Sequence, residues 1–159
     1  MPNTYTQIYI QVVFATKGRS IKIKSEVRAE IEKYICGIFK NKKQKVLAIY
    51  ANPDHVHVFF SYKNLQITIP ELIKTVKIES TNFINEKKLC FGKFSWQEGY
   101  GAFSYAKSQK DKVVSYVLNQ EKHHSKKSFG EEYIEMLNAF EIEFKNEYLF
   151  EFYDGENNL

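Results

Sequence analysis

The alternation of apolar and polar residues near the start of the chain is typical of a strand. Between Tyr5 and Ala15, apolar residues recur at every second position, namely Ile8, Ile10, Val12 and Phe14. This period places them on one face of an extended segment. Apolar residues with helical spacing come next, and they are Val27, Ile31, Tyr34, Ile35, Ile38 and Phe39. The pattern therefore predicts a strand and then an amphipathic helix.

The next apolar runs predict a hairpin and a second helix. Two apolar runs, Val46–Tyr50 and Val56–Tyr62, flank Asn52-Pro53-Asp54. Asn, Pro and Asp are residues that favour a turn. Thr68 and Glu71 have the spacing of a capping box, which begins a helix. The apolar side of this helix comprises Ile69, Leu72, Ile73, Val76, Phe83 and Ile84.

Three further elements are predicted after residue 90. Phe94–Gln97 is interpreted as the fourth strand, which runs into a bend at Gly99 and Gly101. A third helix is expected from Ser108, with Asp111 in its first turn, to about His123. Ser128 and Glu131 form a second capping box, which begins a last helix with one apolar side made of Tyr133, Leu137, Phe140 and Phe144.

The order of these elements indicates the fold class. Strand, helix, strand, strand, helix and strand match the βαββαβ arrangement of ferredoxin-like folds. We therefore expect an α+β fold, in which an antiparallel sheet has helices on one face and C-terminal helices follow. The domain is expected to span residues 1–146 and to be followed by an acidic tail over residues 147–159.

Composition and charge indicate a globular protein with an anionic partner. The chain has 159 residues, of which 43% are hydrophobic and 16% aromatic, enough for one domain with a core. The net charge of +4 conceals an asymmetry, because residues 1–130 hold 22 bases and 10 acids, whereas nine acids and one base follow. A basic body suggests an anionic partner, although a solvated lysine-rich surface explains the charge equally well.

The cysteines and the hydropathy indicate the compartment. Cys36 and Cys90 lack CxxC spacing and are interpreted as reduced structural thiols. No stretch approaches the roughly 18–20 apolar residues that a membrane span needs. We therefore expect a soluble, cytoplasmic protein.

Two histidines are candidates for metal binding. His55 and His57 lie two apart in a predicted strand, so both imidazoles project from the same face and can bind a divalent metal. The alternative is a pair of polar residues on an open sheet face, because so short a motif often occurs by chance. Asp54 could accept a hydrogen bond from an imidazole, but we interpret it as a turn residue.

The other two histidines are interpreted differently. Adjacent residues on a helix point about 100° apart, so His123 and His124 chelate an ion poorly. We interpret both as part of a basic, DNA-facing segment, Lys122–Lys127.

Spacing also selects one of the eleven tyrosines. Tyr116 and Gln120 lie four residues apart on one face of a predicted helix, beside the apolar row of Val113 and Val117. A phenol and a carboxamide at the edge of a packed face can reach a site on the sheet. The alternative is a boundary tyrosine that buries its ring and keeps its hydroxyl in water.

Together these motifs resemble a known family, the HUH single-tyrosine transposases of small bacterial insertion sequences (IS200-like). HUH denotes His-hydrophobic-His, here His55-Val56-His57, within the stretch Asn52–Val58. Trp96–Ser104 resembles the family's fourth strand, and Val113–Gln120 resembles its nucleophile helix. The similarity runs from about Tyr5 to Phe140 in the expected order.

The resemblance implies a transposase that cleaves and rejoins single-stranded DNA through a 5′-phosphotyrosine intermediate. It implies that Tyr116 is the nucleophile, that His55 and His57 bind Mg²⁺ or Mn²⁺, and that Gln120 is the third ligand. It also implies a homodimer, in which the tyrosine helix of one subunit can complete the site of its partner. The substrates implied are hairpins formed by single-stranded element ends.

Basic side chains are candidates for contacts to DNA phosphates. Those expected in this role are Lys17, Arg19, Lys42, Lys43, Lys45, Lys74 and Lys77. Tyr100 and Tyr105 are candidates for stacking on extruded bases.

Two other functions are compatible with the sequence. The first is a domesticated protein of the same fold that binds single-stranded DNA or processes host repeats. The second is a metal-dependent phosphodiesterase that acts on small nucleotides with water as the nucleophile.

Overall fold

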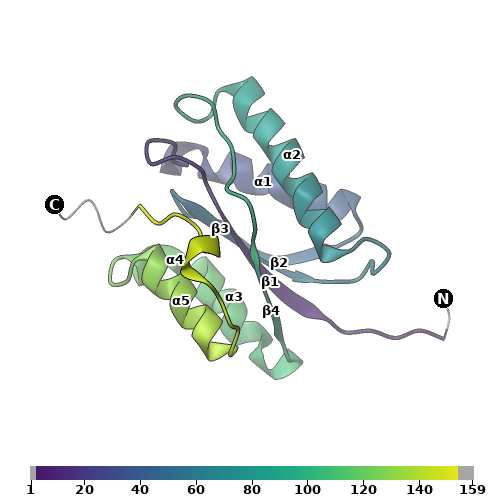
Figure 1. The fold of residues 1–159 in the computed structure, drawn as a ribbon. Helices are drawn as coiled ribbons and strands as arrows, with labels where there is room; N and C mark the ends of the chain where they lie inside the picture. Colours follow the sequence, from purple (N-terminus) through teal and green to yellow (C-terminus); the bar gives the residue numbers. More distant parts are fainter. Residues whose placement is uncertain (1–2, 154–159) are drawn as a thin grey trace.

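A four-stranded antiparallel sheet forms the centre of the protein (Figure 1). The computed structural model describes residues 3–153. The strand order is β2-β3-β1-β4, and the antiparallel sheet expected from the sequence is confirmed. The strands are β1 (Tyr9–Ala15), β2 (Lys45–Ala51), β3 (His55–Ser61) and β4 (Gly101–Tyr105).

Helices cover both faces of the sheet (Figure 1). One face carries α1 (Ser25–Asn41) and α2 (Ile69–Lys87). The other carries helices from the C-terminal third of the chain, α3 (Lys110–Leu118), α4 (Gln120–His124) and α5 (Phe129–Ala139). Two short 3₁₀ helices, η1 (Lys107–Gln109) and η2 (Asn146–Tyr148), complete the elements. The α+β fold is confirmed, and the C-terminal helices form a second layer.

The central strand β1 is buried on both sides. Its residues Val12 and Phe14 pack in the main core with α1 and α2. Val13 and Ala15 point the other way, into a core that includes Phe129 of α5. Because side chains alternate along a strand, β1 separates the main core from the face on which the C-terminal helices lie.

The predicted fourth strand at Phe94–Gln97 is wrong, because the strand lies at Gly101–Tyr105. Backbone groups of Ser95 and Gln97 bond to Lys17 (3.0 Å) and Ala15 (2.8 Å), and a side chain satisfies the backbone of Phe94. Asn85 donates to the carbonyl of Phe94 (3.0 Å) and accepts from its N–H (2.8 Å). Trp96 pairs with Thr16 in an isolated β-bridge and not in a strand.

Lys77 holds the bend that precedes β4. Its Nζ donates to the carbonyls of Gln97 (2.8 Å) and Gly99 (2.6 Å), and Gly99 adopts a φ of +86°. Burial lowers the pKa of Lys77 to about 8. This lysine therefore has a structural role, and its contact with DNA stays a prediction.

The predicted third helix is divided. A 3₁₀ turn precedes α3, and Asn119, with ψ 25°, separates α3 from α4. The Asn119 side-chain amide donates to the carbonyl of Ser115 (2.8 Å), so it competes with backbone N–H groups for a carbonyl of the helix. Ser108 lies inside the 3₁₀ turn and does not begin the helix.

The last helix is shorter than predicted. It begins after the Ser128 cap as expected, but it ends at Ala139, and Glu141 has a left-handed φ of 54°. Phe140 is its C-terminal cap, and Phe144 lies beyond it. The expectation that Phe144 belongs to this helix is therefore wrong.

The end of the described chain packs back onto α5. We name residues 149–153 the C-terminal strap. Phe150 and Phe152 of the strap contact the Phe129 ring, and the Glu151 N–H donates to Oε1 of Gln97 (2.8 Å). The expected acidic tail is described only to Tyr153, and residues 154–159 lie outside the described part. Among the described residues no helix is long and apolar enough to cross a membrane.

Candidate metal centre and nucleophile

Strand β3 begins with the two histidines and turns both toward α5. His55 pairs with Ala15 and His57 with Val13 on β1, so both imidazoles lie on the face that the C-terminal helices cover. Their ring centroids are 5.1 Å apart, and the two residues are 1% and 0% exposed. The predicted shared face is confirmed, whereas an open sheet face is not what the structure shows.

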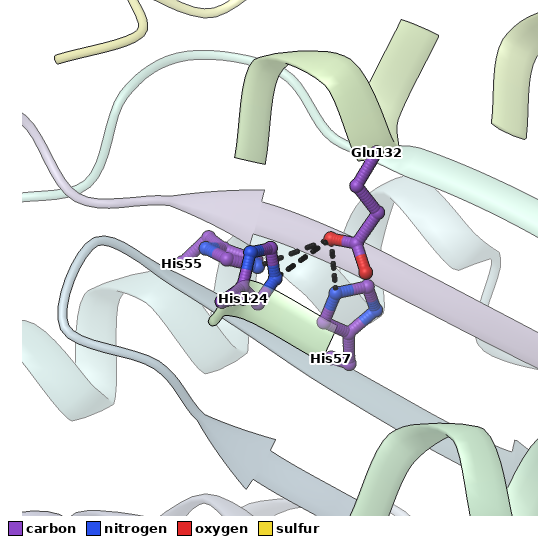
Figure 2. A group of neighbouring side chains, drawn as sticks. All are labelled: His55, His57, His124 and Glu132. Atoms are coloured by element: carbon purple, nitrogen blue, oxygen red, sulfur yellow. Dashed lines mark hydrogen bonds and ion pairs between the residues drawn. The ribbon is translucent and has the colours of Figure 1, made fainter. Parts of the chain in front are cut away.

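Two residues from other elements join the pair. His124, at the end of α4, and Glu132, in α5, lie against it (Figure 2). Glu132 Oε1 is 3.3 Å from His55 Nε2, 3.1 Å from His57 Nε2 and 3.2 Å from His124 Nε2. Three imidazole nitrogens thus converge on one carboxylate oxygen.

The outer nitrogen of each imidazole also has a partner. The Nδ1 of His55 lies 2.7 Å from Asp54 Oδ1, and that of His124 lies 2.8 Å from the carbonyl of Lys127. These acceptors favour a proton on Nδ1, which leaves Nε2 available to a metal. Asp54 therefore does more than the turn role preferred from the sequence.

His57 is oriented by a chain of polar side chains. Its Nδ1 lies 2.8 Å from the Gln11 amide, and the Tyr105 hydroxyl donates to Gln11 Oε1 (2.8 Å). In this structure Gln11 donates its N–H to Nδ1, so the proton of neutral His57 lies on Nε2. Rotation of the amide by 180° would present its carbonyl to Nδ1 and leave Nε2 for a metal. Burial raises the pKa of Tyr105 to about 12, so its hydroxyl stays protonated at neutral pH and can donate to or accept from the amide.

The protonation of the cluster follows from burial and hydrogen bonding. Burial lowers the pKa of His57. For His55, burial acts the same way, but hydrogen bonds to Asp54 and Glu132 outweigh it and raise the pKa. Burial would raise the pKa of Glu132, yet hydrogen bonds from His124, His55 and His57 hold it far below its usual range. Glu132 is therefore a carboxylate at neutral pH.

Tyr116 reaches the same carboxylate from α3. Its hydroxyl donates to Glu132 Oε2, and its ring lies edge-on to the His57 ring, with centroids 5.9 Å apart. Burial and the adjacent Glu132 raise the pKa of Tyr116 well above its ordinary value. The phenol is thus protonated and lies beside the three imidazoles.

Gln120 is buried next to the cluster. Its Nε2 donates to Glu132 Oε2 (3.1 Å), and its Oε1 is 3.0 Å from His124 Nε2. Asn52 also donates to Oε1 (3.2 Å). The structure therefore places Gln120 beside the imidazoles, where its expected role as a ligand stays a prediction.

The structure places the predicted DNA-binding residues in separate regions. Lys17 and Arg19 directly follow the end of β1 that pairs with His55. Lys45 pairs with Ser61 at the far end of β3, roughly 20 Å from His55 at 3.3 Å per residue. Lys42 and Lys43 precede Lys45, and Lys74 and Lys77 lie on α2, across the sheet.

Two residues of the cluster were missed by sequence reasoning. The sequence analysis predicts that His124 faces DNA, yet Tyr116, Gln120 and His124 are each four residues apart and follow one helical stripe. Glu132 occupies a position in the apolar stripe that continues through Phe129 and Tyr133. An acidic residue at such a position requires a partner, and that was the available signal.

Comparisons with known proteins agree with this architecture. The sequence model of the family described as "Transposase IS200 like" matches residues 4–120. No curated protein matches the chain by sequence.

Two solved structures share the fold. A proposed transposase from Deinococcus radiodurans R1 has a TM-score of 0.58 and 20% identity, over 74% of this chain and 94% of that one. A REP-associated tyrosine transposase bound to a REP hairpin has a TM-score of 0.56 and 11% identity, over 77% and 72%.

Proposed function

Since the chain belongs to the IS200-like transposase family, we propose that it cleaves and rejoins single-stranded DNA with Tyr116 as the nucleophile and a divalent metal as cofactor. One observation carries this proposal. The Tyr116 hydroxyl and the imidazoles of His55 and His57 contact the same carboxylate, Glu132. The phenol and the candidate ligands thus share one site although they come from distant parts of the chain.

The donor set fits a divalent metal. His55, His57 and His124 would hold it through Nε2, because the Nδ1 atoms of His55 and His124 face acceptors and that of His57 faces the Gln11 amide, whose carbonyl can turn toward it. Glu132 and Gln120 are the adjacent oxygen donors. When bound, a divalent ion polarises the scissile phosphate and offsets the charge that grows on its oxygens.

The residues of the chain then carry out the transfer. A bond forms between the Tyr116 oxygen and phosphorus while the bond from phosphorus to the 3′ oxygen breaks. Glu132 Oε2 is the nearest acceptor for the phenolic proton, which reaches the departing 3′ oxygen by way of solvent. The products are a 5′-phosphotyrosine and a free 3′-hydroxyl. Because the phosphodiester energy is conserved, another 3′-hydroxyl can reverse the step and join new ends without ATP.

Covalent capture of DNA tests this proposal. Labelled single-stranded DNA from the borders of the gene, incubated with the protein and Mn²⁺, is expected to give a protein–DNA band that survives denaturation. Cleavage without such a band would favour the phosphodiesterase with water as the nucleophile. Binding without cleavage would favour the domesticated DNA-binding protein, and an absence of terminal palindromes around the gene would support that outcome.

The metal preference follows from the ligands. Imidazole suits Mn²⁺ better than Mg²⁺, which prefers oxygen, so Mn²⁺ is expected to raise the melting temperature more. An ion at one hundred times its Kd stabilises the fold by about 2.7 kcal/mol. Substitution of His57 with Ala is expected to remove the shift, whereas His123→Ala, beside the cluster, leaves it. Equal shifts in wild type and His57→Ala would exclude this site.

The substrate and assembly are part of the proposal. The solved REP-associated relative is bound to a REP hairpin, which supports hairpin DNA as the substrate here. Lys17 and Arg19 are the predicted phosphate contacts that follow the strand beside His55. The homodimer stays a proposal drawn from the family resemblance.

A further inference from the structure

Two cavities lie on either side of the loop that joins α4 to α5, residues 125–128. The larger, of about 930 Å³, is lined by Tyr116 and Glu132. The smaller, of about 510 Å³, is lined by Asp54 and His55. The metal cluster is therefore approached from two directions, one on the side of the nucleophile and one on the side of the β2–β3 turn.

The loop between the cavities is basic. His124, Lys126 and Lys127 line both cavities. Exposed lysines extend this charge to each side, with Lys112 and Lys122 in the larger cavity and Lys22 in the smaller.

The acidic residues that line the cavities are Glu132 and Glu135 in the larger cavity and Asp54 and Glu131 in the smaller. Glu135 pairs with Lys127, and Glu132 and Asp54 contact imidazoles.

The larger cavity also has aromatic walls. Tyr105 and Phe140 pack edge to face with centroids 5.4 Å apart, and Phe140 is 37% exposed. Unpaired bases stack on such rings, whereas bases inside a duplex are covered by their neighbours. A basic path with an aromatic wall therefore fits a single strand.

We propose that single-stranded DNA crosses the 125–128 loop at Lys126, with one arm of the strand in each cavity. This inference rests on the proposed function and adds a direction to it. In an in-line displacement the attacking oxygen and the leaving oxygen lie on opposite sides of phosphorus. Because Tyr116 lines the larger cavity, the 3′ oxygen leaves toward the smaller one. The upstream arm, which ends in the 3′-hydroxyl, therefore occupies the cavity of His55, and the downstream arm stays with Tyr116.

Site-directed crosslinking tests the two arms separately. A photo-crosslinker is attached to Lys112→Cys for the larger cavity or to Lys22→Cys for the smaller, in a Tyr116→Phe chain with Cys36 and Cys90 replaced by Ala. With border DNA, the Lys112→Cys probe is expected to crosslink nucleotides downstream of the cleavage site, and the Lys22→Cys probe nucleotides upstream. Lys87→Cys, on α2 across the sheet, is the control and is expected to give neither.

Crosslinks from both probes to the same arm would overturn the inference. A probe in one of the two cavities that gave no crosslink to DNA would also overturn it. The covalent band formed by wild-type protein reports on the proposed function separately, so the two failures are distinguishable.

A salt titration checks the crossing point without crosslinking. Each phosphate contact on a single strand contributes about 0.7 to the slope of log K against log salt. Lys126→Ala in a Tyr116→Phe chain is expected to lower that slope by about this amount and Lys87→Ala to leave it unchanged. An unchanged slope for Lys126→Ala would contradict a crossing at this residue.

Discussion

Tyr116→Phe is expected to abolish the covalent protein–DNA band and to slow strand cleavage by about 10⁴-fold or more, because loss of a nucleophile is rarely compensated. The phenyl ring fills the same half-buried place on α3 beside His57, so the fold is retained. Quantification of the denaturation-resistant band and of the cleaved strand in one reaction measures both effects.

Metal binding by Tyr116→Phe shows whether the variant has lost only the nucleophile or has also disturbed the metal site. Tyr116→Phe removes one donor to Glu132 Oε2, but the Gln120 amide still donates to that atom, and Oε1 keeps its three imidazole contacts. The Mn²⁺-induced rise in melting temperature is therefore expected to persist. Its loss would mean that the variant had disturbed the cluster, and the missing band would then say nothing about the nucleophile.

Tyr105→Phe is the matched control. This second hydroxyl lines the same cavity, but it donates to Gln11 rather than to Glu132. The band is expected to remain in Tyr105→Phe, where the nucleophile is intact, although it forms more slowly because Gln11 has lost the hydroxyl that orients it toward His57. If Tyr116→Phe cleaved the strand at the full rate, and neither Tyr116→Phe nor Tyr105→Phe gave a covalent band, the attack would be assigned to water.

The fold could be predicted where periodicity and burial coincide. Alternation along β1 and helical spacing in α1 gave the correct elements because those residues build the main core. Prediction failed before β4, where side chains of Asn85 and Lys77 satisfy backbone groups of a segment with strand-like composition. Such partners are distant in sequence and leave no periodic signal.

The site could be predicted as far as its motifs extend. His55 and His57 share a face because a strand has a period of two, and Tyr116 with Gln120 follows the helical period. His124 escapes prediction from the His123–His124 pair, because its neighbour on the helix face is Gln120, four residues earlier. Glu132 belongs to α5, beyond residue 120, where the family match ends, and only tertiary packing brings it to the cluster.

A mixture of two inactive variants is expected to stay inactive, which tests whether the site is completed within one chain. Tyr116→Phe lacks the nucleophile and His57→Ala lacks a ligand, so only a site shared between two chains could combine an intact copy of each. In this structure Tyr116 and His57 meet at Glu132 of the same chain. Coexpressed variants are therefore expected to give no covalent band above the level of each variant alone.

The contacts around α5 explain why we expect this outcome. A single residue, Asn119, separates α3 from α4, which keeps Tyr116 close to Gln120 and His124. The C-terminal strap holds α5, and with it Glu132, against the body through Phe150 and through Glu151 bonded to Gln97.

If subunits exchanged their tyrosine helices, half of the dimers in an equal mixture would contain one copy of each variant, and one of the two sites in each such dimer would be intact. About a quarter of wild-type activity would then return, and that result would contradict a site completed within one chain. Circular dichroism of each variant establishes that both are folded, so an inactive mixture reflects the arrangement of the site, and a homodimer would then serve DNA binding rather than assembly of the nucleophile.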